Sequence, residues 1–186
     1  QEAYTRLLNL EAGAKAVPRT HTAKSLVGRQ REWEKLQRAW RLATGQGAHF
    51  VCVWGEAGIG KTRLAEELLN WASQQGFTVA RTRAYAGEGQ LAYAPVVEWL
   101  RVEAVRSARS RLAAVWLSEV ARLAPEILSE HPTAPAPAPM TEPWQRQRLW
   151  EALVRALLAA PQPLLLVIDD LQWCDTETLE WLRYLL

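Results

Sequence analysis

The chain has 186 residues, of which 49% are hydrophobic and 23% charged, and its formal net charge at pH 7 is +2. This length and apolar content suit one domain with a substantial core and exclude an intrinsically disordered composition, while the small net charge does not require a nucleic-acid surface. Two cysteines are too few for a disulfide framework or a metal cluster. Cys52 lies in an apolar run, which favours a small buried side chain. No signal peptide or bilayer-length apolar stretch is visible, so we expect a cytoplasmic protein with no membrane contact.

The N-terminal residues have the pattern of a connection between domains. Residues 1–12 are typical of the end of an upstream helical domain, and 13–25 form a polar, basic linker in which Pro18 interrupts any helix. The chain is therefore expected to begin inside a larger protein, with its main domain over 26–186. The basic excess before the phosphate-binding loop described below indicates a solvated linker and helix face.

The first half of the main domain alternates helices with strands. Apolar residues at three- and four-residue spacing predict a one-faced helix over 29–43, ended by Gly45 and Gly47. The apolar run 49–54 stops at a glycine and predicts a buried strand. A helix over 61–75 with Gly76 as its stop follows, then a strand over 77–82 and helices over 94–105 and 110–124. In the helical segments we expect five tryptophans to pack in the core: Trp33, Trp40, Trp71, Trp99 and Trp150.

The second half opens with a proline-rich piece, 132–139, which indicates a semi-rigid surface loop. Thr141 is the expected cap of the next helix, and 164–168 is a third buried strand. A last helix begins near Asp175, for which the role of helix N-cap is favoured over a catalytic one. Strands alternating with helices predict an α/β fold with a parallel sheet covered on both faces by helices, in three αβα layers.

The segment Gly55–Thr62 fits the phosphate-loop pattern G-x-x-x-x-G-K-[ST] at every fixed position, with a strand before it and a helix after it. Glycines let successive backbone N–H groups point at phosphate oxygens, and the helix adds the positive end of its dipole. Lys61 would reach the β- and γ-phosphates, and the Thr62 hydroxyl would bind Mg²⁺. We therefore expect a P-loop NTPase that binds ATP with Mg²⁺. The expected nucleotide contacts run through Gly55, Glu56, Ala57, Gly58, Ile59, Gly60, Lys61, Thr62 and Arg63.

Two adjacent carboxylates end the third predicted strand. Ligands of open α/β sheets bind at this edge, so Asp169 is the candidate for the Mg²⁺ shell and Asp170 for polarising the attacking water. A turn or cap residue is the alternative for Asp170. The three histidines are scattered, and their spacing does not support a hydrolase triad.

Three motifs together resemble those of the bacterial signal-transducing ATPases with numerous domains, an AAA+-related, origin-recognition-like ATPase group. They are Leu26-Val27-Gly28-Arg29 with Arg31-Glu32, the loop GEAGIGKT, and the run 166–175, LVIDDLQWCD. Cys174 departs from the alanine usual in relatives. The resemblance places Val27 and Arg29 near the adenine end of the nucleotide and starts a helix at Tyr93-Ala94-Pro95. It also implies strand order 2-3-4-1, with the fourth strand and the sensor, arginine and lid elements beyond residue 186. The domain would thus be incomplete at its C-terminus.

The resemblance implies a conformational switch, driven by ATP binding and slow hydrolysis, in a multidomain bacterial transcriptional regulator. Its partners would be ATP and ADP, DNA through domains outside this segment, and further copies of itself in an ATP-dependent manner. Two alternatives stay open. The same module could control a signalling enzyme such as a nucleotide cyclase or protein kinase, or it could bind nucleotide without turnover.

Overall fold

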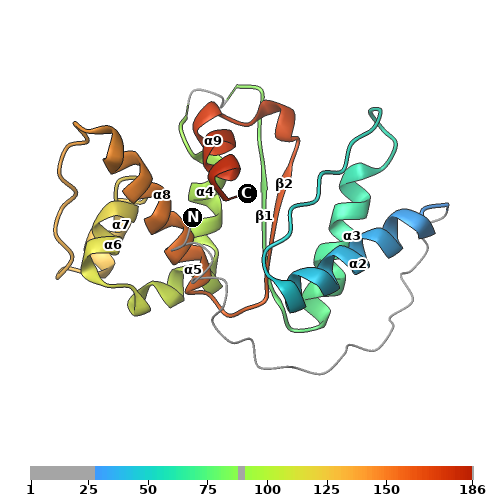
Figure 1. Cartoon of the computed structure of the whole chain (residues 1–186), viewed down its shortest axis with the longest axis horizontal. Coiled ribbons are helices and arrows are strands. Elements are labelled where there is room, and N and C mark those ends of the chain that lie inside the picture. Colours follow the sequence, from blue (N-terminus) through green and yellow to red (C-terminus); the bar gives the residue numbers. More distant parts are fainter. Residues whose placement is uncertain (1–27, 88–90, 186) are drawn as a thin grey trace. The chain divides into compact units, whose positions relative to one another are not determined.

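The computed structural model describes residues 28–87 and 91–185 (Figure 1). The chain folds into two compact units, with the division between Phe77 and Thr78. The upstream segment 1–12, the linker 13–25 and Val27 lie outside the described residues. No helix of the described part is long and apolar enough to cross a membrane.

The first unit is built on two helices, α2 (Gln30–Gln46) and α3 (Lys61–Gln74). Both lie close to the positions that the apolar spacing predicts, although α2 continues through Gly45 and ends at Gly47. Trp71 of α3 lies edge-on to both Trp33 and Trp40 of α2, with ring centroids 6.2 Å apart in each pair. The predicted packing role of these tryptophans is confirmed, because Trp33 and Trp40 are buried.

The predicted buried strand over 49–54 is wrong for the described structure. Residues 48–54 have no regular secondary structure, and all of them are exposed. A strand requires a neighbouring strand to satisfy its backbone hydrogen bonds, and an apolar sequence alone does not supply one. For the same reason the expected burial of Cys52 is wrong, since the residue is exposed. Trp54, directly before the phosphate loop, is 88% exposed.

The second unit contains a parallel pair of strands, β1 (Thr78–Arg83) and β2 (Leu164–Asp169). Their register aligns Thr78 with Leu164 and Arg83 with Asp169. This confirms both strands and the adjacency of the second and third strands that the resemblance implies. β2 is half-buried along its whole length, however, and not fully buried as predicted. The second unit thus has an α/β structure, in which helices pack against a small parallel sheet (Figure 1).

Short helices fill the connection between the two strands and follow β2. They are α4 (Ala94–Arg101), α5 (Glu103–Ala108), the 3₁₀ turn η1 (Arg109–Arg111), α6 (Ala114–Val120), α7 (Glu126–Glu130), α8 (Pro143–Leu158), the 3₁₀ turn η2 (Leu171–Trp173) and α9 (Thr176–Leu185). The helices predicted over 94–105 and 110–124 are each wrong in length. Val102 and Leu112 adopt extended ψ angles of 133° and 143°, which end a helix.

The start of α8 is one residue later than the predicted cap. Glu142, not Thr141, is the N-cap, and it forms a reciprocal capping box with Gln145. The amide oxygen of Gln145 accepts the backbone N–H of Glu142 at 2.8 Å and also that of Thr141 at 2.5 Å. A polar residue at either position would fit the sequence pattern, so the reciprocal glutamine decides the boundary.

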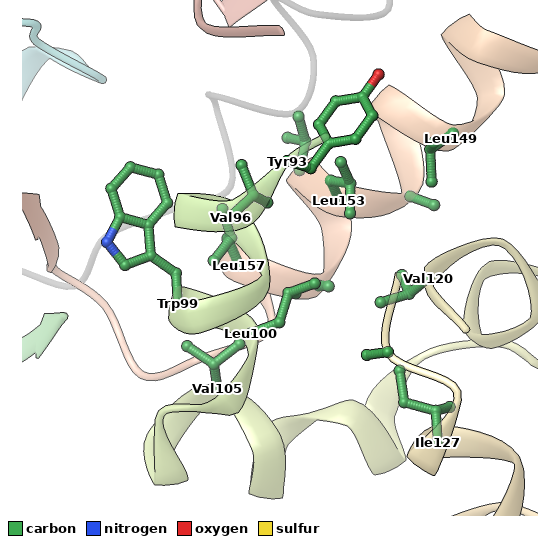
Figure 2. Packing of buried hydrophobic residues seen from close by; sticks show 14 of the residues in the cluster. Tyr93, Val96, Trp99, Leu100, Val105, Val120, Ile127, Leu149, Leu153 and Leu157 are labelled. Atoms are coloured by element: carbon green, nitrogen blue, oxygen red, sulfur yellow. The ribbon is translucent and has the colours of Figure 1, made fainter. Parts of the chain in front are cut away.

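The core of the second unit lies between α4, α8 and the short helices α5 to α7 (Figure 2). Val96 and Leu100 of α4 and Leu153 of α8 are completely buried. Burial of a Val or Leu side chain contributes about 1.5–3 kcal/mol, so this cluster is a main source of the unit's stability. Ala80 of β1 belongs to the cluster and Leu166 of β2 packs against it, so the core also holds the sheet. Trp99 and Trp150 belong to it, as predicted.

Candidate functional site

The phosphate loop of the first unit has a backbone that only glycine adopts easily at three points, of which the first is Gly55 with φ +153°. Gly58 has φ +75° and Gly60 has φ +90°, both in the left-handed region. The loop turns back on itself through a 3.4 Å hydrogen bond from the Ile59 N–H to the Glu56 carbonyl. Gly60 is also the N-cap of α3, and its carbonyl accepts the Leu64 N–H at 3.1 Å. The glycines of the motif therefore create the sharp turn into the helix.

Lys61 holds the two ends of this loop together. Its ammonium group donates to the carbonyls of Gly55 and Glu56, at 2.9 Å each. An ammonium has three protons, so two such bonds leave it one more for an anion. The side chain expected to reach the phosphates therefore already lies over the loop.

Arg29 is the second cation at the loop. It is the N-cap residue of α2, and its Nη2 donates to the carbonyl of Ile59. A Cβ placed on Gly60 would lie 3.8 Å from its Nε, so the guanidinium is in van der Waals range of the glycine. The side chain of Arg29 therefore contacts the phosphate loop. The resemblance implied a different position for it, near the adenine end of the nucleotide.

The first turn of α3 carries the other predicted contacts. Thr62 and Arg63 are exposed, and Arg63 forms a 2.6 Å ion pair with Glu67 one turn later. The first turn of α3 has no acidic residue. Acids usually gather at this end because it carries about half a positive charge, so α3 presents that charge without an internal counterion.

The acidic pair belongs to the second unit, at the carboxyl end of β2. Asp169 ends the strand, and Asp170 follows in the left-handed conformation with φ +57°. Each acid is held by an arginine of β1: Arg81 contacts Asp169 at 3.0 Å, and Arg83 contacts Asp170 at 2.7 Å. The side chain of Asp169 is 12% exposed and that of Asp170 is 27% exposed. The carboxylates are thus partly buried and charge-compensated.

The two ion pairs differ in their detail. Arg83 donates to Asp170 from Nε as well as from Nη2, at 2.8 and 2.7 Å. The hydrogen bond with Asp170, followed by the attraction of its charge, raises the pKa of Arg83. Asp170 also accepts from the Gln172 side chain at 3.2 Å, which occupies its other carboxylate oxygen.

Sequence reasoning missed these two arginines. They alternate along β1 with the buried Thr82 between them, so both point to one face of the strand. Register alone brings them next to the acids, because Arg83 aligns with Asp169. A charged i, i+2 pair near the end of one strand, with an acidic pair at the end of the next parallel strand, is the signal that would have found them.

Asp175 is a helix cap, as predicted. Its carboxylate accepts the Thr178 N–H at 2.7 Å and the Thr178 hydroxyl at 2.8 Å, and it is buried. It also accepts the backbone N–H of Tyr93 at 2.9 Å. Tyr93 precedes α4, so the helix start that the resemblance implies at Tyr93-Ala94-Pro95 is confirmed.

The chemistry of the candidate metal ligands suits Mg²⁺. The Thr62 hydroxyl and the Asp169 carboxylate are hard oxygen donors, which Mg²⁺ prefers. Across 28–87 and 91–185, no group of three or more His, Cys, Asp or Glu side chains is arranged to hold a metal ion. Thr62 belongs to the first unit and Asp169 to the second, so each is judged as a ligand by itself. A nucleotide-bound Mg²⁺ takes only one or two protein ligands and completes its shell with phosphates and water, so either oxygen donor fits that ion.

Comparison with protein families matches residues 25–186 to a family described as AAA ATPase domain. Searches among curated proteins and among solved structures gave no match. The family match spans the phosphate loop, both acids and the two arginines of β1.

Proposed function

This chain belongs to the AAA ATPase domain family, and we propose that its phosphate loop, Gly55–Thr62, binds ATP together with Mg²⁺. The family implies nucleotide binding and, in general, ATP hydrolysis. The backbone of the loop is the observation that carries the assignment to these residues. The left-handed Gly60 opens α3, and Lys61 spans the loop through the Gly55 and Glu56 carbonyls.

In this proposal the residues at the loop have different roles in binding the nucleotide. The backbone N–H groups and the N-terminus of α3 bind the phosphates, and Lys61 supplies a full positive charge. Thr62 and Asp169 provide oxygen ligands for Mg²⁺, which offsets phosphate charge when bound. Glu56, Ala57, Ile59 and Arg63 line the nucleotide through their position in the loop and the first turn. Val27 is proposed at the adenine end by resemblance and lies outside the described residues.

Asp170 is proposed to orient and polarise the water that attacks the γ-phosphate. A carboxylate can accept a proton from that water, and removing such a group commonly slows a reaction 10²- to 10⁴-fold. The left-handed backbone at Asp170 supports this role, because non-glycine residues in that region are concentrated at functional sites.

The cellular role we propose is a conformational switch in a multidomain bacterial transcriptional regulator in the cytoplasm. ATP occupancy would set the conformation, and slow hydrolysis would reset it. DNA would be bound through domains outside this segment, and the ATP state would favour self-association. Control of a signalling enzyme, or binding without turnover, are the second candidates; the three-motif resemblance favours the regulator.

Titration calorimetry of Mg·ATP with the full chain and with Lys61→Ala tests the assignment. Loss of a charged hydrogen-bond donor costs about 1.5–3 kcal/mol, which corresponds to roughly ten- to a hundredfold in affinity. Lys35→Ala is the matched control, since Lys35 is an exposed cation of α2 in the same unit. Equal affinities of Lys61→Ala and the control would refute this loop as the binding site.

A further inference from the structure

The guanidinium of Arg29 contacts the phosphate loop at the point where the loop becomes a helix. Its Nη2 donates to the carbonyl of Ile59, and its Nε lies beside the space that a side chain on Gly60 would fill. Ile59 precedes the N-cap of α3, so its carbonyl is outside the hydrogen-bond ladder of the helix. An external donor is therefore what fixes the direction of that peptide group.

The direction of the Ile59 carbonyl determines where the next N–H points. A peptide unit is planar, so a carbonyl held on one side aims the N–H of the following residue, Gly60, to the opposite side. Phosphate binding by such a loop depends on a series of N–H groups that all point inward. A donor on the Ile59 carbonyl holds this peptide unit in one orientation before any nucleotide is present.

The charge around this point also favours an anion. Arg29 and Lys61 bring two cations to the positive end of α3, whose first turn contains no acid. Cations at a helix N-terminus are ordinarily unfavourable, by a few tenths to about 1 kcal/mol each. A polyphosphate would remove this cost, which ties the contact of Arg29 to phosphate and not to a base.

We propose that Arg29 is a positioning residue of the phosphate loop, which sets the affinity for the polyphosphate part of the nucleotide through the Ile59 carbonyl. This inference rests on the proposed function and deepens it. It replaces the adenine-end role that the resemblance implies for the Arg29 side chain.

The test compares Mg·ATP with Mg·tripolyphosphate, which has the phosphates but no base. Dissociation constants of both are measured on the full chain, on Arg29→Ala and on Arg29→Lys, with tripolyphosphate used to displace a fluorescent ATP analogue. We expect Arg29→Ala to weaken both ligands by the same factor, about tenfold. Arg29→Lys keeps a charged donor and should recover most of the loss.

Arg38→Ala is the matched control, because Arg38 is an exposed cation of the same helix. Weakened ATP binding with unchanged tripolyphosphate binding would return Arg29 to the adenine end and overturn the inference. Wild-type affinity of Arg29→Ala for both ligands would overturn it as well, while Lys61→Ala still reports the loop as the binding site. Absence of any ATP binding by the unmodified chain would instead remove the proposed function, and the inference with it.

Discussion

The backbone N–H of Tyr93 donates a 2.9 Å hydrogen bond to the carboxylate of Asp175, 82 residues further along the chain. The same carboxylate caps α9 through Thr178, and the hydroxyl of Tyr93 accepts the indole N–H of Trp150 in α8 at 2.9 Å. Tyr93 and Asp175 thus connect the starts of α4 and α9 and, through Trp150, reach α8. Burial is the main cause that raises the pKa of Tyr93, so its hydroxyl stays neutral at physiological pH while it accepts the indole N–H of Trp150.

Asp175→Ala is expected to lower the free energy of unfolding by about 3 kcal/mol, because two buried N–H groups lose a charged acceptor. Urea unfolding followed by circular dichroism measures the change. Asp175→Asn keeps one oxygen acceptor and should lose about 1 kcal/mol. Glu177→Ala, at an exposed position two residues later, should change stability by less than about 0.5 kcal/mol. A loss in Asp175→Ala no larger than in this control would contradict the network.

Substitution of the two acids at the end of β2 should have different effects, one on Mg·ATP binding and the other on the rate of hydrolysis. Asp169→Asn is expected to weaken Mg·ATP relative to metal-free ATP, because a ligand of the ion becomes neutral. Asp170→Asn should bind Mg·ATP normally and slow single-turnover hydrolysis by 10²- to 10⁴-fold.

Arg83→Ala is the control for Asp170, because it breaks the same ion pair and keeps the carboxylate. If hydrolysis falls in Asp170→Asn and not in Arg83→Ala, the carboxylate itself is responsible. A wild-type hydrolysis rate in Asp170→Asn would mean that Asp170 is a turn residue, as its left-handed backbone also allows.

Gly60→Ala and Gly76→Ala impose the same backbone strain at opposite ends of α3. Their φ angles are +90° and +79°, and each alanine should cost about 1–2 kcal/mol of stability. Only Gly60→Ala is expected to weaken Mg·ATP binding, because only Gly60 directs the N–H groups of the loop. Thermal unfolding and titration calorimetry on both variants check this. Similar ATP affinities of the two variants would show that the turn at Gly60 is structural alone.

The two cysteines are expected to differ in reactivity toward iodoacetamide. Burial, reinforced by the nearby charge of Asp175, raises the pKa of Cys174 to about 11. At pH 8, three units below that pKa, only about one thiol in a thousand is a reactive thiolate. Cys52 is exposed and should be alkylated first. Mass spectrometry of peptides after timed alkylation measures the order, and faster labelling of Cys174 would contradict the burial of its thiol.

The sequence predicts best where a local pattern is sufficient for the structure. The bounds of α3 follow from the phosphate-loop motif and Gly76, and the cap at Asp175 follows from its position before Thr176. Prediction is poorer where the outcome depends on distant partners. Residues 49–54 have the composition of a strand but no regular structure. A strand forms only when a second strand pairs with it, and the sequence of one segment does not show whether such a partner is present.

In the candidate site, too, the sequence predicts the residues with local contacts better than those with distant contacts. Lys61 and the glycines of the loop are evident from spacing, because their contacts lie within a few residues. The pairing of Arg81 and Arg83 with the acids depends on strand register, and the contact of Arg29 with Ile59 spans 30 residues. Side chains that act across such separations have no signature within a few residues, so they can be predicted only by comparing distant segments or by knowing the fold.

The exposed indole of Trp54 gives the phosphate loop a built-in fluorophore. It directly precedes Gly55 and is 88% exposed, whereas Trp33 and Trp40 in the same unit are buried. Trp144 and Trp173 are about half exposed, so a collisional quencher such as acrylamide would reach the indole of Trp54 most readily. A ligand that orders the loop should shift the emission and reduce the quenching, and Trp54→Phe should abolish that response. The chain can thus report occupancy of its own loop optically, without an attached dye.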